Sequence, residues 1–105
     1  MSDPIDPVIR RFRSALAATY GRRLERVVLF GSRARGDARP DSDYDVAVFI
    51  EELQSLGQEA DRIAEIETDI LRDTGAVINA LPLRAGSYAE TTGLMAELRR
   101  EGVDV

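Results

Sequence analysis

Apolar residues recur every three to four positions in three stretches of the chain, which predicts helices over residues 6–20, 53–74 and 87–100. The middle stretch is the longest and has the most regular stripe. Its apolar positions are Leu53, Leu56, Ala60, Ile63, Ile66 and Ile70. A stripe of this kind lies on one face of a helix, so we expect each helix to bury that face against a common partner.

Residues with strong preferences for helix ends stand where these stretches begin and stop. Asp6 suits an N-cap, Pro7 suits the first helical position, and Gly21 suits the end of the first helix. Ser87 and Glu90 match the capping-box pattern at the start of the last helix. The helix boundaries are therefore predicted from capping chemistry as well as from periodicity.

Three shorter runs are rich in β-branched and apolar residues, and these predict strands over residues 26–30, 44–50 and 76–83. Residues 32–36 resemble a brief helical turn, and residues 37–42 resemble a loop. Pro82 has no N–H to contribute to a strand ladder, so it indicates the end of the third strand or an edge position.

The resulting order is helix, strand, turn, strand, helix, strand, helix. We expect one α/β (α+β) domain over residues 1–105, with a small mixed sheet and helices packed mainly on one face. The chain of 105 residues suits a single core and leaves no room for a separate substrate domain.

The amino-acid composition excludes several types of catalysis, metal site and binding partner. The chain has no histidine and no cysteine, which excludes histidine-dependent catalysis, thiolate metal sites and disulfides. The net charge of −5 argues against general nucleic-acid binding. No apolar run approaches the roughly 20 residues of a membrane helix, and the polar start MSDPIDP does not resemble a secretory signal. We therefore expect a cytoplasmic protein with no membrane partner.

Two carboxylates open the second predicted strand. Asp43 and Asp45 are two residues apart, so both project from the same strand face, about 6–7 Å apart at Cα. Mg²⁺ commonly binds one or two protein carboxylates together with water and substrate phosphate. An isolated pair at a strand end is more often solvated surface, but Asp45 shares its face with Ala47 and Phe49.

A phosphate-binding turn is the second candidate feature. Gly31 directly follows the first predicted strand, and Ser32 begins the short helical turn. Such a junction exposes backbone N–H groups that attract phosphate, and the serine hydroxyl adds a donor. A Gly-Ser pair alone is weak evidence, because it can simply turn the chain. Neither a P-loop nor a dinucleotide-binding glycine pattern follows.

Three arginines lie between these two features. Arg33, Arg35 and Arg39 could neutralise a triphosphate through bidentate contacts. We place Arg33 ahead of the other two, because it stands beside the turn. Each arginine taken singly fits solvated surface charge as well. The cluster therefore supports a phosphate site only together with Gly31, Ser32 and the carboxylates.

The whole stretch GSRARGDARPDSDYD resembles the signature of the minimal nucleotidyltransferases of the DNA polymerase β-like superfamily. That signature is Gly-Ser, ten residues, then Asp-x-Asp, often with Arg-Gly between them and a serine before the first aspartate. The matching residues are Gly31, Ser32, Arg35, Gly36, Ser42, Asp43 and Asp45. Chain length and element order also resemble this family.

The resemblance implies an enzyme that uses ATP and Mg²⁺, with two ions held by Asp43 and Asp45. Gly31 and Ser32 would hold the β- and γ-phosphates, with Arg33, Arg35 and Ser42 completing the nucleotide site. An acceptor hydroxyl would attack the α-phosphorus and release pyrophosphate. Many small members are similar to antitoxins paired with a HEPN-domain toxin, and some transfer AMP to a toxin tyrosine.

The chain departs from the family pattern at one position. Family members usually carry a third carboxylate on the next strand, where the best match here is the neutral Asn79. Transfer would then suit a tyrosine acceptor, whose pKa near 10 reduces the need for a base, or Asp73 or an acceptor group could substitute. Alternatively, the chain is a catalytically weak module that binds nucleotide and neutralises a toxin by contact. The sequence leaves the oligomeric state open.

Overall fold

The computed structural model describes residues 6–105, so the first five residues of the polar start lie outside the described part. Four strands form one mixed sheet in the order β3-β2-β1-β4. The strands are β1 (Leu24–Phe30), β2 (Tyr44–Ile50), β3 (Ile78–Arg84) and β4 (Val103–Asp104). The helices are α1 (Pro7–Tyr20), α2 (Ser32–Arg35), α3 (Leu56–Thr74) and α4 (Gly93–Glu101), with 3₁₀ turns η1 (Gly21–Arg23) and η2 (Ser87–Ala89).

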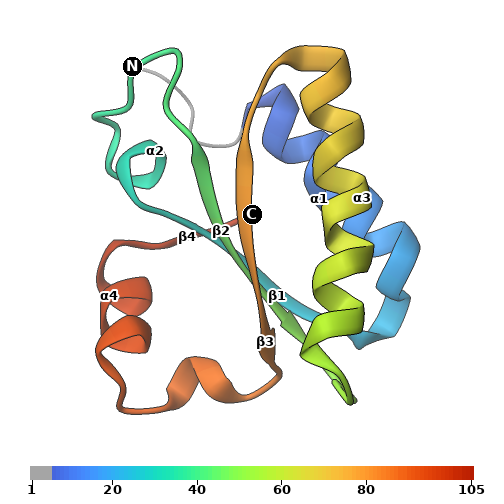
Figure 1. The fold of residues 1–105 in the computed structure, drawn as a ribbon. Coiled ribbons are helices and arrows are strands. Elements are labelled where there is room, and N and C mark those ends of the chain that lie inside the picture. The colour runs from blue at the N-terminus through green and yellow to red at the C-terminus, as the bar shows by residue number, and fades with distance from the viewer. Residues whose placement is uncertain (1–5) are drawn as a thin grey trace.

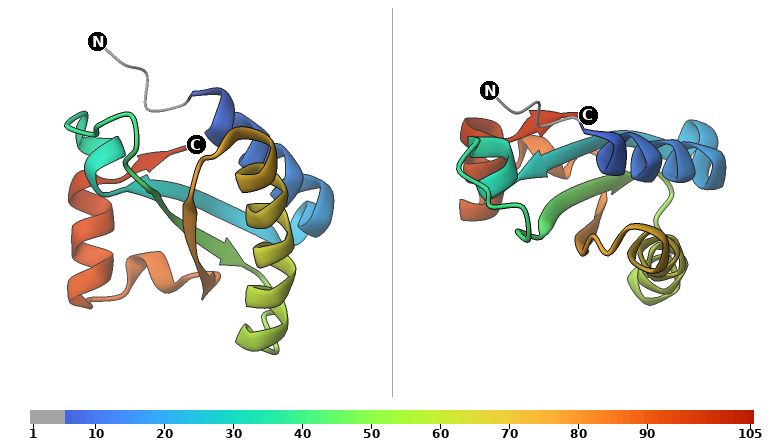
Figure 2. Two further views of the ribbon diagram at one scale, coloured as in Figure 1. Left: turned by 45° about the horizontal axis from the view of Figure 1, so that its top comes forward. Right: turned by 90° about the horizontal axis from the view of Figure 1, so that it is seen from above.

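The sheet lies between helices of unequal extent (Figures 1 and 2). The long helices α1 and α3 cover one face, and the short α4 packs against the other. Strand β1 runs antiparallel to β2 and β4, whereas β2 and β3 are parallel and connected through α3. This arrangement confirms the expected mixed α/β sheet with most helical packing on one face.

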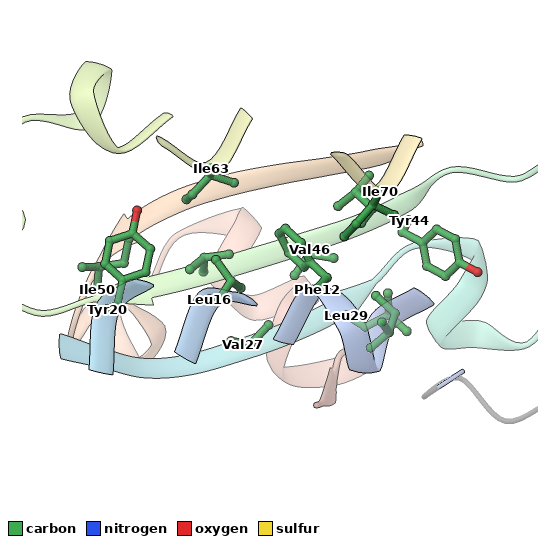
Figure 3. Packing of buried hydrophobic residues seen from close by; sticks show 13 residues of the cluster. Phe12, Leu16, Tyr20, Val27, Leu29, Tyr44, Val46, Ile50, Ile63 and Ile70 are labelled. Carbon is green, nitrogen blue, oxygen red and sulfur yellow. The ribbon is translucent and has the colours of Figure 1, made fainter. Parts of the chain in front are cut away.

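The larger core lies between the sheet and the two long helices (Figure 3). Phe12 and Leu16 come from α1, Ile63 and Ile70 from α3, and alternate strand residues such as Val46 point toward them. These side chains are at most 1% exposed. Burial of this many apolar groups is the main force that holds the two helices on the sheet.

A smaller core occupies the opposite face of the sheet. Its buried members are Val28, Ala47, Phe49, Met95 and Leu98. Since α4 has only nine residues, it covers part of this face and leaves the start of β2 outside the cluster. The face that carries Asp45 is therefore packed at one end of the strand and open at the other.

Of the three predicted helix starts, the first was right and the other two were not. Asp6 caps α1, with its Oδ1 accepting from the Ile9 amide at 3.1 Å. The proposed capping box of Ser87 and Glu90 is wrong, because Ser87 begins the separate turn η2 and Thr92 caps α4 instead. Helix α3 likewise begins later than predicted, at the N-cap Ser55.

Strand β4 was not predicted from the sequence. It contains only two residues, and Val103 pairs with Leu29 of β1. The next residue, Val105, donates its amide to the Val27 carbonyl at 3.0 Å and accepts from Arg13 Nε at 3.0 Å. Such a short strand exists through tertiary pairing, so its own sequence carries little signal.

Strand β3 lies at one edge of the sheet, as Pro82 indicated. The side chain of Glu67 on α3 accepts a hydrogen bond from the Ala80 backbone amide. Pro82 supplies no further N–H. Along the part of the chain that the structure describes, no helix is long and apolar enough to cross a membrane.

Candidate functional site

The Gly-Ser turn leaves β1 directly beside the first residues of β2. Phe30, the last residue of β1, pairs with Asp45, and Gly31 follows with φ 74° and ψ −158°. This backbone conformation is almost exclusive to glycine. A Cβ at Gly31 would lie 2.5 Å from Asp45 Oδ2, which is closer than real atoms approach. The turn and the carboxylate are thus in contact, and a side chain at position 31 would displace the Asp45 carboxylate.

Ser32 begins α2, whose last two amides already have partners. The amides of Ala34 and Arg35 donate to the Gly31 carbonyl, each at 3.1 Å. The first amides of a helix have no partner inside the helix. The turn therefore presents backbone N–H groups next to the carboxylates, as the phosphate interpretation requires.

The two carboxylates and Asn79 meet at the same end of the sheet. Asp45 pairs with Phe30 on one side and with Asn79 on the other. The side-chain amide of Asn79 donates to Asp43 Oδ2 at 3.0 Å. Asp45 is half-buried, whereas Asp43 and Asn79 are exposed. Asn79 therefore occupies the place at the carboxylate pair that sequence comparison with the family pattern suggested.

This donor set fits a hard divalent cation. Two carboxylates and an amide oxygen, if the amide turns over, are oxygen ligands of the type that Mg²⁺ prefers, with the remaining positions left to water and phosphate. Among the described residues, no group of three or more acidic, histidine or cysteine side chains could hold a metal. The protein thus supplies an incomplete shell, which suits an ion shared with a substrate.

Ser42 stabilises the turn that leads into Asp43. Its hydroxyl accepts from the Arg39 amide at 2.8 Å, and its own amide donates to the Arg39 carbonyl at 3.0 Å. The structure therefore gives Ser42 a loop-closing role, while its proposed contact with nucleotide stays a prediction.

Arg33 reaches across the same loop. Its Nε and Nη2 donate to the Ser42 carbonyl at 3.0 and 2.8 Å, and Nη2 also donates to the Pro40 carbonyl at 3.1 Å. Its guanidinium carbon lies 3.9 Å from the centre of the Tyr44 ring. Most donors of Arg33 are thus engaged with protein, although we expected this arginine to be first among the phosphate ligands.

Arg35 is more accessible than Arg33. Its side chain is 43% exposed and forms surface ion pairs with Asp37 at 3.3 Å and with Glu101 at 3.6 Å. Surface pairs of this kind are weak and exchange readily. Asp73, considered above as a substitute base, forms an ion pair with Arg11 at 2.6 Å.

One contact at this end, between Tyr44 and Asp6, was not predicted from the sequence. Tyr44 stands between the two aspartates but points to the opposite face, where it is 4% exposed, and its hydroxyl donates to Asp6 Oδ2 at 2.5 Å. Burial, followed by this hydrogen bond, raises the pKa of Tyr44 to about 12. The alternation of side chains along the strand indicates the face of Tyr44, but local patterns carry no signal for its partner Asp6.

Comparison with known proteins agrees with this geometry. Residues 15–99 match the family model described as Polymerase beta, Nucleotidyltransferase. The chain is 37% identical over 100 residues to "Putative protein adenylyltransferase MJ0141" of Methanocaldococcus jannaschii, covering 93% of this chain and 95% of that protein.

Solved structures give the same fold. A protein described as a "putative minimal nucleotidyltransferase" is 28% identical, with a TM-score of 0.62 over 99% of this chain and 97% of that one. A toxin-antitoxin structure with AMP-PNP is similar at a TM-score of 0.61 and 19% identity, covering 89% of this chain and 68% of that one. At that identity, the second likeness concerns the fold alone. On the family match and the close relative, this chain belongs to the polymerase β-like nucleotidyltransferases, enzymes that transfer a nucleotidyl group to an acceptor.

Proposed function

We propose that the protein transfers AMP from ATP to a hydroxyl group of a partner protein in a Mg²⁺-dependent reaction. The observation that supports this proposal is the contact between the Gly-Ser turn and the carboxylate pair. Gly31 lies so close to Asp45 that a Cβ would meet Oδ2 at 2.5 Å, and Asn79 donates to Asp43. A triphosphate bound at the turn would therefore lie next to the carboxylates.

Each residue has a role that its position supports. The backbone at Gly31 and Ser32 would receive the β- and γ-phosphates, and the accessible Arg35 would neutralise part of their charge. Asp43 and Asp45 would hold Mg²⁺ ions, which when bound supply charge neutralisation at the attacking and leaving oxygens. The exposed positions of Asp43 and Asn79 leave the acceptor side of the site open to a second protein.

The neutral side chain of Asn79 affects which acceptor group the reaction can use. In the transfer, the acceptor oxygen bonds to the α-phosphorus, the bond to the bridging oxygen breaks, and pyrophosphate leaves. The acceptor proton must go elsewhere, because an amide cannot take it. A tyrosine phenol has a pKa near 10 and loses its proton to water far more easily than an aliphatic hydroxyl. We therefore propose tyrosine as the acceptor.

The partner that we propose is a HEPN-domain toxin, with this chain as its antitoxin in the cytoplasm. Support comes from the resemblance of the motif to antitoxins of this type and from the fold shared with a toxin-antitoxin structure. The relative MJ0141 is named a protein adenylyltransferase, which agrees with a protein acceptor.

The test uses α-labelled ATP, Mg²⁺ and the protein encoded beside this chain. We expect label on that partner, lost in both Asp43→Asn and Asp45→Asn. The matched control is Asp41→Asn, an exposed aspartate of the same loop, which should transfer label as the wild type does. Label that persists in both site variants would contradict the assigned carboxylates. Label that survives conversion of every partner tyrosine to phenylalanine would contradict the acceptor.

A second function is favoured by one observation, the amide at position 79. Its hydrogen bond to Asp43 neutralises no charge and provides no base. A module of this kind could bind nucleotide without turnover and neutralise a toxin by direct contact. A stable complex with the partner, together with ATP binding but no label transfer, would establish this alternative.

A further inference from the structure

Arg33 connects the Gly31-Ser32 turn with the loop that leads into Asp43. It belongs to α2, one residue after Ser32, and its guanidinium reaches the carbonyl of Ser42, the residue before Asp43. The Pro40 carbonyl is a second acceptor in the same loop. One side chain thus connects the start of the phosphate turn with the start of the carboxylate pair.

The far side of the guanidinium is also fixed. Its central carbon lies over the Tyr44 ring, 3.9 Å from the ring centre, and Nη1 is 4.0 Å from Asp6 Oδ2. The same Asp6 oxygen accepts from the Tyr44 hydroxyl at 2.5 Å. The Arg33 side chain is only 18% exposed. An arginine held by two carbonyls, a ring and a carboxylate has little freedom to turn toward a ligand.

We propose that Arg33 is a positioning residue that holds Asp43 and Asp45 at a fixed place relative to the Gly31-Ser32 turn. It does so by binding the loop carbonyls on one side and the Tyr44 ring on the other. Phosphate binding falls to the backbone of the turn and to other arginines. The consequence for a metal site rests on the function proposed above, but the fixing of the loop does not.

The chemistry of the contacts explains why this position needs arginine. Two N–H groups that converge on one carbonyl, with the central carbon over a ring, require the guanidinium. Lysine keeps the positive charge but lacks both features. The Arg33→Lys variant therefore distinguishes a residue that holds the loop in place from one that only supplies positive charge to a phosphate.

The first measurement is amide hydrogen exchange over residues 37–45, without nucleotide or metal. Arg33→Lys should raise exchange there by roughly tenfold or more, the size expected from losing a hydrogen bond to a charged donor. The matched control is Arg26→Lys, because Arg26 also lies over a tyrosine ring, Tyr88, at 4.0 Å. That variant should leave exchange in residues 37–45 unchanged.

The second measurement is Mn²⁺ binding to the protein alone. We expect Arg33→Lys to weaken it by roughly 10- to 100-fold, as is usual when the support of a metal ligand is removed. Arg33→Ala should behave similarly and regain affinity with low concentrations of guanidinium but not of ammonium. A wild type that binds no Mn²⁺ would overturn the metal site proposed above, and loop exchange alone would then decide the role of Arg33.

The third measurement is binding of inorganic triphosphate in the presence of EDTA. If Arg33 positions the carboxylates, Arg33→Lys leaves this affinity within about twofold, because the charge and the backbone turn remain. Unchanged exchange in residues 37–45 would overturn the proposal. So would a large loss of triphosphate affinity with unchanged exchange, since Arg33 would then be a direct phosphate ligand.

Discussion

Tyr44 and Tyr20 lie at opposite ends of the same core (Figure 3). Each has a carboxylate and an arginine beside it. Both rings are 4% exposed. At the Tyr44 end the hydroxyl donates to Asp6 at 2.5 Å and Arg33 lies 3.9 Å from the ring centre. These contacts form a closed network around the start of β2.

The Tyr20 end has the same kinds of group in a looser arrangement. Its hydroxyl is buried beside the Glu59 carboxylate, without a hydrogen bond of good geometry among the described residues, and Arg23 lies 5.7 Å from the ring centre. The arginine of this end donates to the carbonyls of Glu51 and Glu52 instead. The two ends thus contain the same types of residue but differ in their hydrogen bonds. We call the Tyr44 end, which lies next to Asp43 and Asp45, the ordered end, and the Tyr20 end the looser end.

The largest effect should come from removing the carboxylate at the centre of the ordered end. Asp6→Ala loses both the α1 cap and the acceptor of the Tyr44 hydroxyl. We expect the free energy of unfolding to fall by about 2–4 kcal/mol in urea titrations. Ser55→Ala, which removes only the cap of α3, should cost about 0.5–2 kcal/mol. Equal losses in the two variants would show that the Tyr44 hydrogen bond adds nothing.

Tyr44→Phe tests the hydrogen bond without touching the helix cap. The variant removes the tyrosine donor to Oδ2 of the half-buried Asp6, so we expect a loss of about 1.5–3 kcal/mol in the same urea titration. Exchange in residues 37–45 should rise as well, since Arg33 and Tyr44 share Asp6. A loss no larger than that of Tyr20→Phe would remove the distinction between the two ends.

Asn79→Asp adds a third carboxylate at the ordered end. Without metal, it would face Asp43 across 3.0 Å and replace a hydrogen bond with repulsion, so thermal stability should fall. Isothermal titration with Mn²⁺ should show roughly tenfold tighter binding, because the charge of the ligand set increases. Asn79→Ser, which replaces the amide with a shorter neutral hydroxyl, should not bind Mn²⁺ more tightly. Weaker binding in Asn79→Asp would argue against a metal at this site.

The smallest effect is expected at the looser end. Tyr20→Phe should change the free energy of unfolding by less than about 1 kcal/mol at pH 7. Burial raises the pKa of Tyr20 above its ordinary value, and the Glu59 carboxylate adds to the rise. A raised folded pKa gives stability that is present below about pH 10 and lost above it. Urea titrations from pH 8 to 11 should therefore show a smaller alkaline loss in Tyr20→Phe than in the wild type.

The sequence predicted most accurately what local patterns determine. The strand over residues 44–50 has the predicted bounds, and Asp43 lies one residue before it. The Asp6 cap was also right, because the cap and the helix pattern are neighbours in the chain. The meeting of Gly31, Asp45 and Asn79 followed from the resemblance, which carries information about tertiary contacts that periodicity lacks.

What the sequence did not reveal depends on residues far apart in the chain. Strand β4 exists because β1 offers it an edge. Ser87 and Glu90 have the right residue types for a capping box, but the tertiary path begins the helix later, at Thr92. Arg33 was predicted to bind phosphate because it stands beside the Gly-Ser turn, and that role stays a prediction. Only the structure places its guanidinium against Ser42 and Tyr44.

The blocked edge of β3 has a consequence for behaviour at high concentration. Unpaired strand edges allow proteins to join sheet to sheet and aggregate. Here the Ala80 amide is occupied by Glu67, and Pro82 has none to offer. A second molecule would find no regular row of donors along this strand. The acidic side chain and the proline thus limit edge-to-edge association at the strand that carries Asn79.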